Sequence, residues 1–305
     1  MIMTDRIHRD EPEEGYIHLP DGRLHYLNWG GSGRQIHFLH ANGFCAGTYA
    51  PFLNHLAGTY RVIASDVRGH GDSTFPQPGT IRSWEVFAED LKAVVEGAME
   101  PPVVGMGHSL GAVTTCIAAA RYPTLFSAIV LLDPVFLTDS IRWRFALLRW
   151  LGLRRWLPKA RVARQRKRSF ASKQSALKRF VAGRGIFKSW SEEFIEAYME
   201  CGLLQHDADK AILRCDPELE AQIFESVPLN VWKTVARVKC PILAVRGEKS
   251  DTFRPESASR LEQVAANALV VTQPEAGHFL PMEKPAMAAA TIAGFIDRVV
   301  PEGSM

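Results

Sequence analysis

The chain has 305 residues, of which 47% are hydrophobic and 10% aromatic, with 23 Gly and 18 Pro. This is ordinary globular composition, and it excludes the disordered, collagen-like and disulfide-scaffold classes. No run of about 18 uncharged apolar residues occurs, and residues 1–19 lack an apolar core, so we expect neither a transmembrane helix nor a secretory signal. The five cysteines show no C-x-x-C spacing, which predicts neither a zinc site nor a disulfide framework and favours a reducing, cytoplasmic location.

The net charge of +3 conceals an uneven distribution along the chain. Sixteen of the 36 Lys and Arg residues lie between Ser140 and Ser191, a segment without Asp or Glu. The rest of the chain carries 20 basic and 33 acidic side chains. A basic block within an acidic body indicates a separate subdomain.

From Gly15 onward, short apolar runs alternate with longer helical patterns, which is typical of an α/β protein with a mostly parallel sheet. The first two strands read as a hairpin that turns at Asp21-Gly22. Further strands are expected at 35–41, 60–67, 102–109, 128–135, 241–248 and 268–277, and helices near 47–57, 83–99, 110–121, 255–266 and 285–299.

This alternation stops between about Leu137 and Trp232. The intervening stretch has no convincing strand and reads as several helices, with Pro158 and Pro217 as helix breakers. Strand spacing resumes at Pro241, so the stretch is an insertion and not a C-terminal domain. We expect a core at 1–137 and 233–305, and a basic helical cap at 138–232.

The strongest chemical motif is Gly107-His108-Ser109-Leu110-Gly111, between the apolar run PVVGM and a helix rich in small residues. A nucleophile on a tight strand-to-helix turn needs glycines two residues to either side, because neighbouring chains come too close for a Cβ. The turn exposes the hydroxyl at a helix N-terminus, where backbone N–H groups favour a developing anion. Ser109 is therefore the candidate nucleophile.

Three further segments extend this pattern: His40-Ala41-Asn42-Gly43-Phe44, Arg68-Gly69-His70-Gly71-Asp72-Ser73 and Gly277-His278-Phe279. Each follows an expected strand. With the serine motif, they resemble the α/β-hydrolase family in family order, over nearly the whole chain outside the cap. The resemblance implies that fold, with a mostly parallel central sheet flanked by helices and a helical cap inserted after the sixth strand.

A serine hydroxyl needs a base, and the resemblance assigns that role to His278. The family's usual acid position falls on Asp251, four residues after Gly247, which gives the order Ser, Asp, His. Asp133 is the alternative acid, since some members place the acid after the earlier strand. Asp133 also precedes Pro134, so it could instead shape the turn into the cap.

The resemblance also implies an oxyanion hole made by the backbone N–H groups of Leu110 and Asn42. Ala41 stands where the family usually has Gly, and the Asn42 side chain is a second way for that residue to meet a substrate. Six side chains are candidates for binding substrate or supporting the motifs: His40, His108, Trp190, Phe194, Tyr198 and Phe224.

A serine nucleophile argues against epoxide hydrolases and haloalkane dehalogenases of this fold, which use Asp. Serine with histidine suits acyl transfer, and we expect a cofactor-free hydrolase of carboxylic esters with medium acyl or lipid-like groups, acting on a small molecule without a metal. Alternatives are a carbon–carbon bond hydrolase or a thioesterase on the same residues. A non-hydrolytic lyase or a ligand-binding member of the fold is a further alternative.

The cap segment 141–168 interleaves Trp143, Trp150 and Trp156 with basic residues. Helical spacing places Trp143, Leu147, Trp150 and Leu151 on one stripe. This stripe either packs on the core or forms an amphipathic surface that touches anionic lipid or receives an acyl chain. Nucleic-acid binding is disfavoured, because no nucleic-acid-binding fold accompanies the basic residues.

Overall fold

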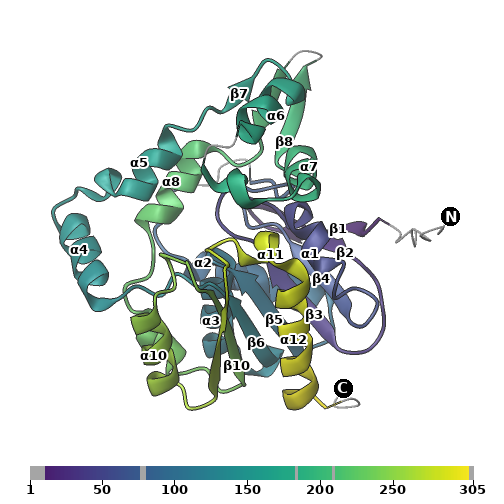
Figure 1. Cartoon of the computed structure of the whole chain (residues 1–305), viewed down its shortest axis with the longest axis vertical. Helices are drawn as coiled ribbons and strands as arrows, with labels where there is room; N and C mark the ends of the chain where they lie inside the picture. The colour runs from purple at the N-terminus through teal and green to yellow at the C-terminus, as the bar shows by residue number, and fades with distance from the viewer. Residues whose placement is uncertain (1–10, 76–79, 183–184, 208–209, 302–305) are drawn as a thin grey trace.

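The computed structural model describes residues 11–75, 80–182, 185–207 and 210–301 (Figure 1). Residues 1–10, which belong to the segment expected to lack a secretory signal, lie outside this part. Within the described residues, no helix combines the length and apolar character needed to cross a membrane.

An eight-stranded sheet forms the centre of the molecule, in the order β1-β2-β4-β3-β5-β6-β10-β11. The strands from β4 to β11 run parallel, and the hairpin β1–β2 joins them antiparallel to β4. Leu19 pairs with Gly22, so the hairpin turns at Pro20-Asp21, one residue earlier than expected. The bounds are β1 Glu13–Leu19, β2 Gly22–Asn28, β3 Gln35–Leu39, β4 Arg61–Ser65, β5 Val103–His108, β6 Phe126–Leu132, β10 Ile242–Gly247 and β11 Ala268–Gln273.

Helices cover both faces of this sheet, as the mostly parallel α/β fold requires. On β6, Ala128 and Val130 pack in a core cluster with α1 and α12, whereas Ile129 and Leu131 pack in a second cluster with α2, α3, α9 and α10. Burial on both faces explains why the strands read as continuous apolar runs. The bounds are η1 Ala46–Tyr49, α1 Ala50–Leu53, α2 Glu85–Ala98, α3 Leu110–Arg121, η2 Pro123–Leu125, α9 Val231–Val235, α10 Pro255–Val264, α11 Leu280–Glu283 and α12 Pro285–Val299.

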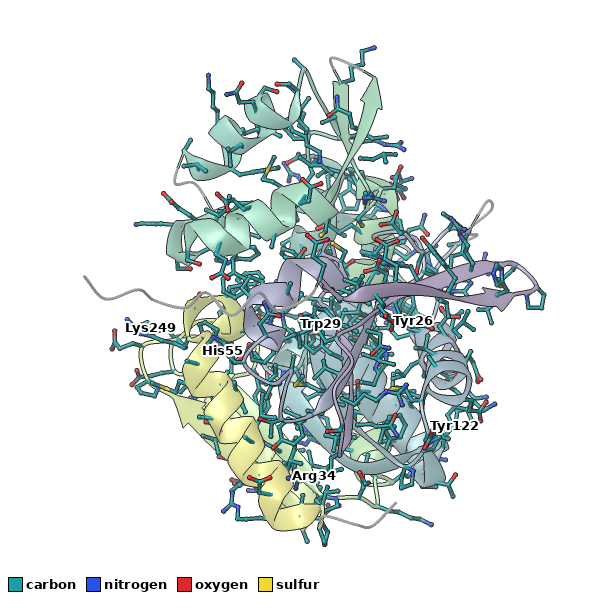
Figure 2. The ribbon with its side chains drawn as sticks, turned by 90° about the vertical axis from the view of Figure 1, so that its right-hand side faces the viewer. Tyr26, Trp29, Arg34, His55, Tyr122 and Lys249 are labelled. Atoms are coloured by element: carbon teal, nitrogen blue, oxygen red, sulfur yellow. The ribbon has the colours of Figure 1, made fainter. Side chains whose placement is uncertain are left out.

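The segment between β6 and α9 lies above the core in both views (Figures 1 and 2), and we call it the cap. Its helices are α4 Asp139–Trp150, η3 Arg154–Trp156, α5 Pro158–Arg164, α6 Lys173–Val181, η4 Gly185–Ser189, α7 Glu192–Cys201 and α8 Pro217–Glu225. Pro158 and Pro217 open α5 and α8 and do not break a helix, since the first helical position needs no N–H donor.

The expectation of a cap without strands was wrong. Three short strands form an antiparallel sheet in the order β7-β9-β8, with bounds β7 Ser169–Phe170, β8 Leu203–Asp207 and β9 Lys210–Leu213. Their shortness explains the miss, because two to five residues carry too little periodicity to separate a strand from a loop.

Candidate active site

Ser109 occupies the turn between β5 and α3 and is held in a strained backbone conformation. Its φ and ψ are 55° and −107°, outside the regions that non-glycine residues favour. A Cβ on Gly107 would lie 2.3 Å from the carbonyl carbon of Gly111, and a Cβ on Gly111 would lie 2.0 Å from the carbonyl oxygen of Leu39. Both glycines are thus required by close backbone approach, which is the reason the motif suggested.

His278 lies on the loop after β11, and its ring reaches the serine. Its Nε2 is 3.1 Å from the Ser109 Oγ, so the hydroxyl can donate to the ring. The two residues follow parallel strands, whose carboxyl ends meet at one edge of the sheet. This edge therefore holds a hydroxyl and the base that it needs.

The acid beside His278 is Asp133, and the preference for Asp251 is corrected by the geometry. His278 Nδ1–H donates to Asp133 Oδ2 at 2.6 Å, and the Asp133 carboxylate is fully buried. Asp251 is exposed, and its Oδ1 accepts a hydrogen bond from Thr252 Oγ1. After β10 the chain turns Ser250 inward and leaves Asp251 facing outward.

Two further donors, from the end of β10 and from the loop after it, bind the Asp133 carboxylate. Ser250 Oγ–H donates to Oδ2 at 2.5 Å, and the Gly247 N–H donates to Oδ1 at 3.1 Å. Asp133 itself has a φ of 43°, an uncommon value for a residue other than glycine. A buried carboxylate with three hydrogen bonds is well placed to orient an imidazole and to stabilise its charged form.

In the loop after β3, the backbone N–H groups on either side of Asn42 are hydrogen-bonded within the described residues, whereas that of Asn42 is not. Ala41 N–H donates to the Tyr49 hydroxyl at 3.2 Å, and Gly43 N–H donates to His70 Nε2 at 3.1 Å. In the described part of the chain, the intervening N–H of Asn42 donates no hydrogen bond. The N–H of Leu110, at the first position of α3, has no acceptor within its helix.

The Asn42 side chain is committed elsewhere. Its Nδ2 donates to the backbone carbonyl of Glu220 on the cap helix α8, at 3.0 Å. The alternative that this amide meets the substrate is therefore not supported. The contact ties the loop to the cap.

The structure also corrects His40 and His108 as substrate-binding candidates. Both rings are fully buried. His40 donates from Nδ1 to the Ala41 carbonyl and accepts at Nε2 from the Val67 N–H. His108 accepts from the Tyr49 hydroxyl at 2.7 Å and donates to the His278 carbonyl at 2.8 Å, so both nitrogens of each ring are occupied.

Burial keeps these supporting rings neutral. It lowers the pKa of His40, and together with the nearby His278 it holds the pKa of His108 well below the usual value. The pKa of His70 falls to about 3, mainly through burial. A neutral ring has one donor and one acceptor, which is the pattern that His108 uses.

Aromatic side chains from the cap and the core meet beside His278. We call this group the inner aromatic cluster, and its members are Phe44, Phe187, Trp190, Tyr198 and Phe279. The Phe279 ring lies 5.0 Å from the His278 ring and 5.7 Å from Trp190, and Tyr198 lies 5.6 Å from Phe44. Two of the predicted side chains, Trp190 and Tyr198, thus reach the site.

The other two aromatic candidates lie farther out. Phe194 is buried behind Trp190, with ring centroids 6.4 Å apart, and with Trp190 it lines a cavity of about 400 Å³ beside α11. Ser109, His278 and Asp133 do not line this cavity. Phe224 packs against the contact between α5 and α8, which corrects its assignment to the substrate pocket.

Sequence reasoning assigned no role to three residues that hold the site together. Tyr49 links the loop after β3 to His108, and Ser250 fixes Asp133. Glu283 accepts from the Gly277 N–H at 2.5 Å and so anchors the His278 loop. Of the three, only Glu283 could have been found from a local pattern, because it lies close to the Gly277-His278-Phe279 motif in the sequence.

The described residues bring together one group that could hold a metal ion, formed by His25, Asp66 and Asp72. The Asp66 carboxylate already accepts from His25 Nδ1 and from the N–H groups of Ala46 and Asp72, at 2.7, 2.7 and 2.9 Å. The group therefore works as a hydrogen-bonded junction beneath the loop after β4.

Comparison with known families and proteins agrees with this architecture. Residues 36–285 match a family model described as the alpha/beta hydrolase fold. A solved structure of E-2-(acetamidomethylene)succinate hydrolase has a TM-score of 0.78 at 24% identity, covering 94% of this chain and 99% of its own. A thioesterase domain from the curacin biosynthetic pathway has a TM-score of 0.72 at 19% identity, covering 93% and 100%.

Two curated relatives extend the comparison to sequence. The 2-(acetamidomethylene)succinate hydrolase of Mesorhizobium japonicum is 25% identical over 88% of this chain and 89% of its own length. A bifunctional esterase/perhydrolase of Acinetobacter calcoaceticus is 34% identical, but over only 36% of this chain and 40% of its own. The sequence similarity thus extends to relatives named as a hydrolase and as an esterase/perhydrolase.

Proposed function

Because this chain belongs to the α/β-hydrolase family and is a hydrolase of that fold, we propose that it is a serine hydrolase that cleaves carboxylic esters through an acyl-enzyme on Ser109. The observation that carries the proposal is the continuous hydrogen-bonded chain from Ser109 through His278 to Asp133, at 3.1 and 2.6 Å.

The first half of the reaction forms the acyl-enzyme. Ser109 Oγ attacks the ester carbonyl while His278 Nε2 takes the hydroxyl proton, and Asp133 stabilises the resulting imidazolium. The N–H groups of Leu110 and Asn42 stabilise the oxyanion. His278 then gives its proton to the departing alkoxide oxygen, and the alcohol leaves.

The second half returns the enzyme. His278 removes a proton from water, and the resulting hydroxide attacks the acyl carbon on Ser109. Collapse of the tetrahedral intermediate breaks the bond to Oγ, which recovers its proton from His278, and the carboxylic acid is released. Side chains and backbone groups of this chain carry every step.

The apolar surroundings favour an acyl group without charge. Trp190 and Tyr198 reach from the cap toward Phe279, next to His278, and the Ser109 side chain is itself buried. Such a setting binds a medium acyl chain by excluding water from it.

A series of p-nitrophenyl esters with about two to twelve acyl carbons tests the proposal, with wild type compared with Ser109→Ala and His278→Ala. Each variant should lose roughly 10³-fold or more in kcat/KM, and the preferred chain length reports the size of the acyl site. Retention of a tenth of the wild-type rate by a folded Ser109→Ala protein would refute the assignment.

A second candidate is hydrolysis of an N-acyl group on a dicarboxylic acid, as the name of the Mesorhizobium japonicum relative indicates for that protein. The specific observation is Arg166, which pairs with Glu220 and donates to the Tyr198 hydroxyl at 2.7 Å. A Cβ on Gly43 would lie 3.0 Å from its Nη1, so this guanidinium borders the loop after β3. A cation there could meet a substrate carboxylate.

Paired substrates separate the two candidates. Esters and N-acyl compounds would each be assayed with and without carboxylate groups, for wild type and Arg166→Gln. If Arg166→Gln raises KM only for the substrates that carry carboxylate groups, the second candidate is supported. Equal KM changes for all substrates rule it out.

A further inference from the structure

The outer arm of the cap exposes large apolar side chains. We call them the outer stripe: Trp143, Leu147 and Trp150 on α4, and Trp156 in η3. Their exposed fractions are 67%, 54%, 82% and 67%. The three α4 residues are spaced by four and three positions, so they form one continuous strip on the helix surface. Single exposed apolar residues are common, whereas a strip of this size marks an interaction surface.

The stripe faces outward because the opposite face of α4 is the one that packs. Phe145 and Leu148 pack against a small cluster formed with α5 and α8. Arg149 Nη1 donates to the Val227 carbonyl at 2.8 Å, and Asp139 pairs with Arg260 at 2.8 Å, which fixes the rotation of the helix. The alternative that the stripe packs on the core is therefore wrong. In Figure 1, α4 lies at the outer edge of the molecule, far from α6 and α7.

The surface around the stripe is positively charged. Arg144, Arg155 and Arg161 are exposed on α4, η3 and α5. The nearby acids on α8 are already paired: Glu218 with Arg164 at 2.7 Å, and Glu225 with Arg164 at 2.7 Å and Arg154 at 3.5 Å. The charges beside the outer stripe that these acids do not neutralise are thus positive.

We propose that the outer stripe docks on an anionic membrane surface, with the tryptophans at the headgroup level and the arginines on lipid phosphates. Indole rings favour the boundary between water and acyl chains, and long basic side chains reach back to the headgroups. Each basic residue near such a surface also gains from its negative potential. A second copy of this chain is a poorer partner, because it would bring a face of the same charge.

Vesicle co-sedimentation of the full chain tests this proposal. The probes are vesicles of phosphatidylcholine alone and vesicles with about a third phosphatidylglycerol. Wild type should partition about tenfold or more better into the anionic vesicles, and the difference should shrink in about 0.5 M NaCl because salt screens the attraction.

Three double variants locate the contact. Trp143→Ala with Trp150→Ala, and Arg144→Glu with Arg155→Glu, should each lower partition about tenfold or more. Lys178→Glu with Arg179→Glu makes the same charge change on exposed residues of α6, at the other end of the cap, and should stay within about twofold of wild type. Unchanged thermal unfolding and ester hydrolysis verify that each variant is folded, and these readouts keep this test separate from that of the proposed function.

Three outcomes overturn the proposal. If the tryptophan variant partitions into anionic vesicles as well as wild type does, the outer stripe does not contact the membrane. A dimer that forms in solution and is lost in that variant would identify a second copy as the partner. Salt-sensitive binding to an oligonucleotide, without binding to anionic vesicles, would assign the basic surface to nucleic acid.

Discussion

The carboxyl edge of the sheet and the outer arm of the cap are neighbours in sequence and opposites in environment. Asp133 directly follows β6, with no exposed surface and three hydrogen bonds, whereas Trp150 ends the next helix, α4, with 82% of its surface exposed. At the edge, buried polar groups are paired and fix one geometry. On the arm, the apolar side chains of the outer stripe are more than half exposed.

This contrast teaches that the two regions act in different ways. A buried hydrogen-bonded chain performs chemistry by holding atoms in place, so single-atom changes there should be costly. An exposed stripe acts through the area that it offers to a partner, so truncation there should leave folding and chemistry alone. Matched variants can break or sharpen the comparison.

The largest effect is expected at the acid. Asp133→Asn should lower kcat by about 10³-fold or more, because an amide cannot hold His278 in the required tautomer or stabilise its charge. Asp251→Asn, on an exposed side chain, should stay within about twofold. Steady-state kinetics on the preferred ester measures both, and the reverse order would return the acid role to Asp251.

A glycine pair probes the tight turn at the nucleophile. Gly107→Ala should cost several kcal/mol of folding free energy, roughly 3 or more, because its Cβ would meet the Gly111 backbone at 2.3 Å. Gly294→Ala, in α12 with open space around it, should gain about 0.5–1 kcal/mol. Denaturant unfolding measures both changes. Comparable stability of the two variants would contradict the account given for the serine motif.

A tryptophan pair compares the two faces of the cap. Trp190→Ala should cost about 3–5 kcal/mol of folding free energy, because the indole is 7% exposed and packs within the inner aromatic cluster. Trp150→Ala should change it by about 0.5 kcal/mol or less. Thermal unfolding measures the shifts. A large loss in Trp150→Ala would mean that the stripe is part of the core.

Among the four buried positions tested, the smallest effect is expected at Tyr49. Tyr49→Phe should cost about 2 kcal/mol of folding free energy, because it leaves the Ala41 N–H and His108 Nδ1 without their partner in a buried setting. Tyr122→Phe, which removes an exposed hydroxyl bonded to Glu89, is the matched control and should cost under about 0.5 kcal/mol. Chemical denaturation of both proteins measures the two losses of folding free energy. Equal losses would mean that the buried hydrogen bonds of Tyr49 do not stabilise the fold.

Local patterns in the sequence were enough for the core and for part of the site. Strand runs buried on both faces read as continuous apolar segments, and Gly107 and Gly111 mark the serine turn because no other residue fits there. These features depend on neighbours close in the chain or on the shape of one turn. The strands of the cap were missed because they are too short to show a periodic pattern.

The sequence by itself determined the α/β fold, the cap insertion, and Ser109 and His278 as candidates, because each is encoded in a local pattern or motif. Only the tertiary structure decided that Asp133 and not Asp251 meets His278, that Phe224 lies outside the site, and that the tryptophans of α4 face outward. These outcomes depend on which way a loop or a helix turns. Contacts with residues far away in the chain, such as Ser250 for Asp133 and Val227 for Arg149, set that direction, and no local pattern carries them.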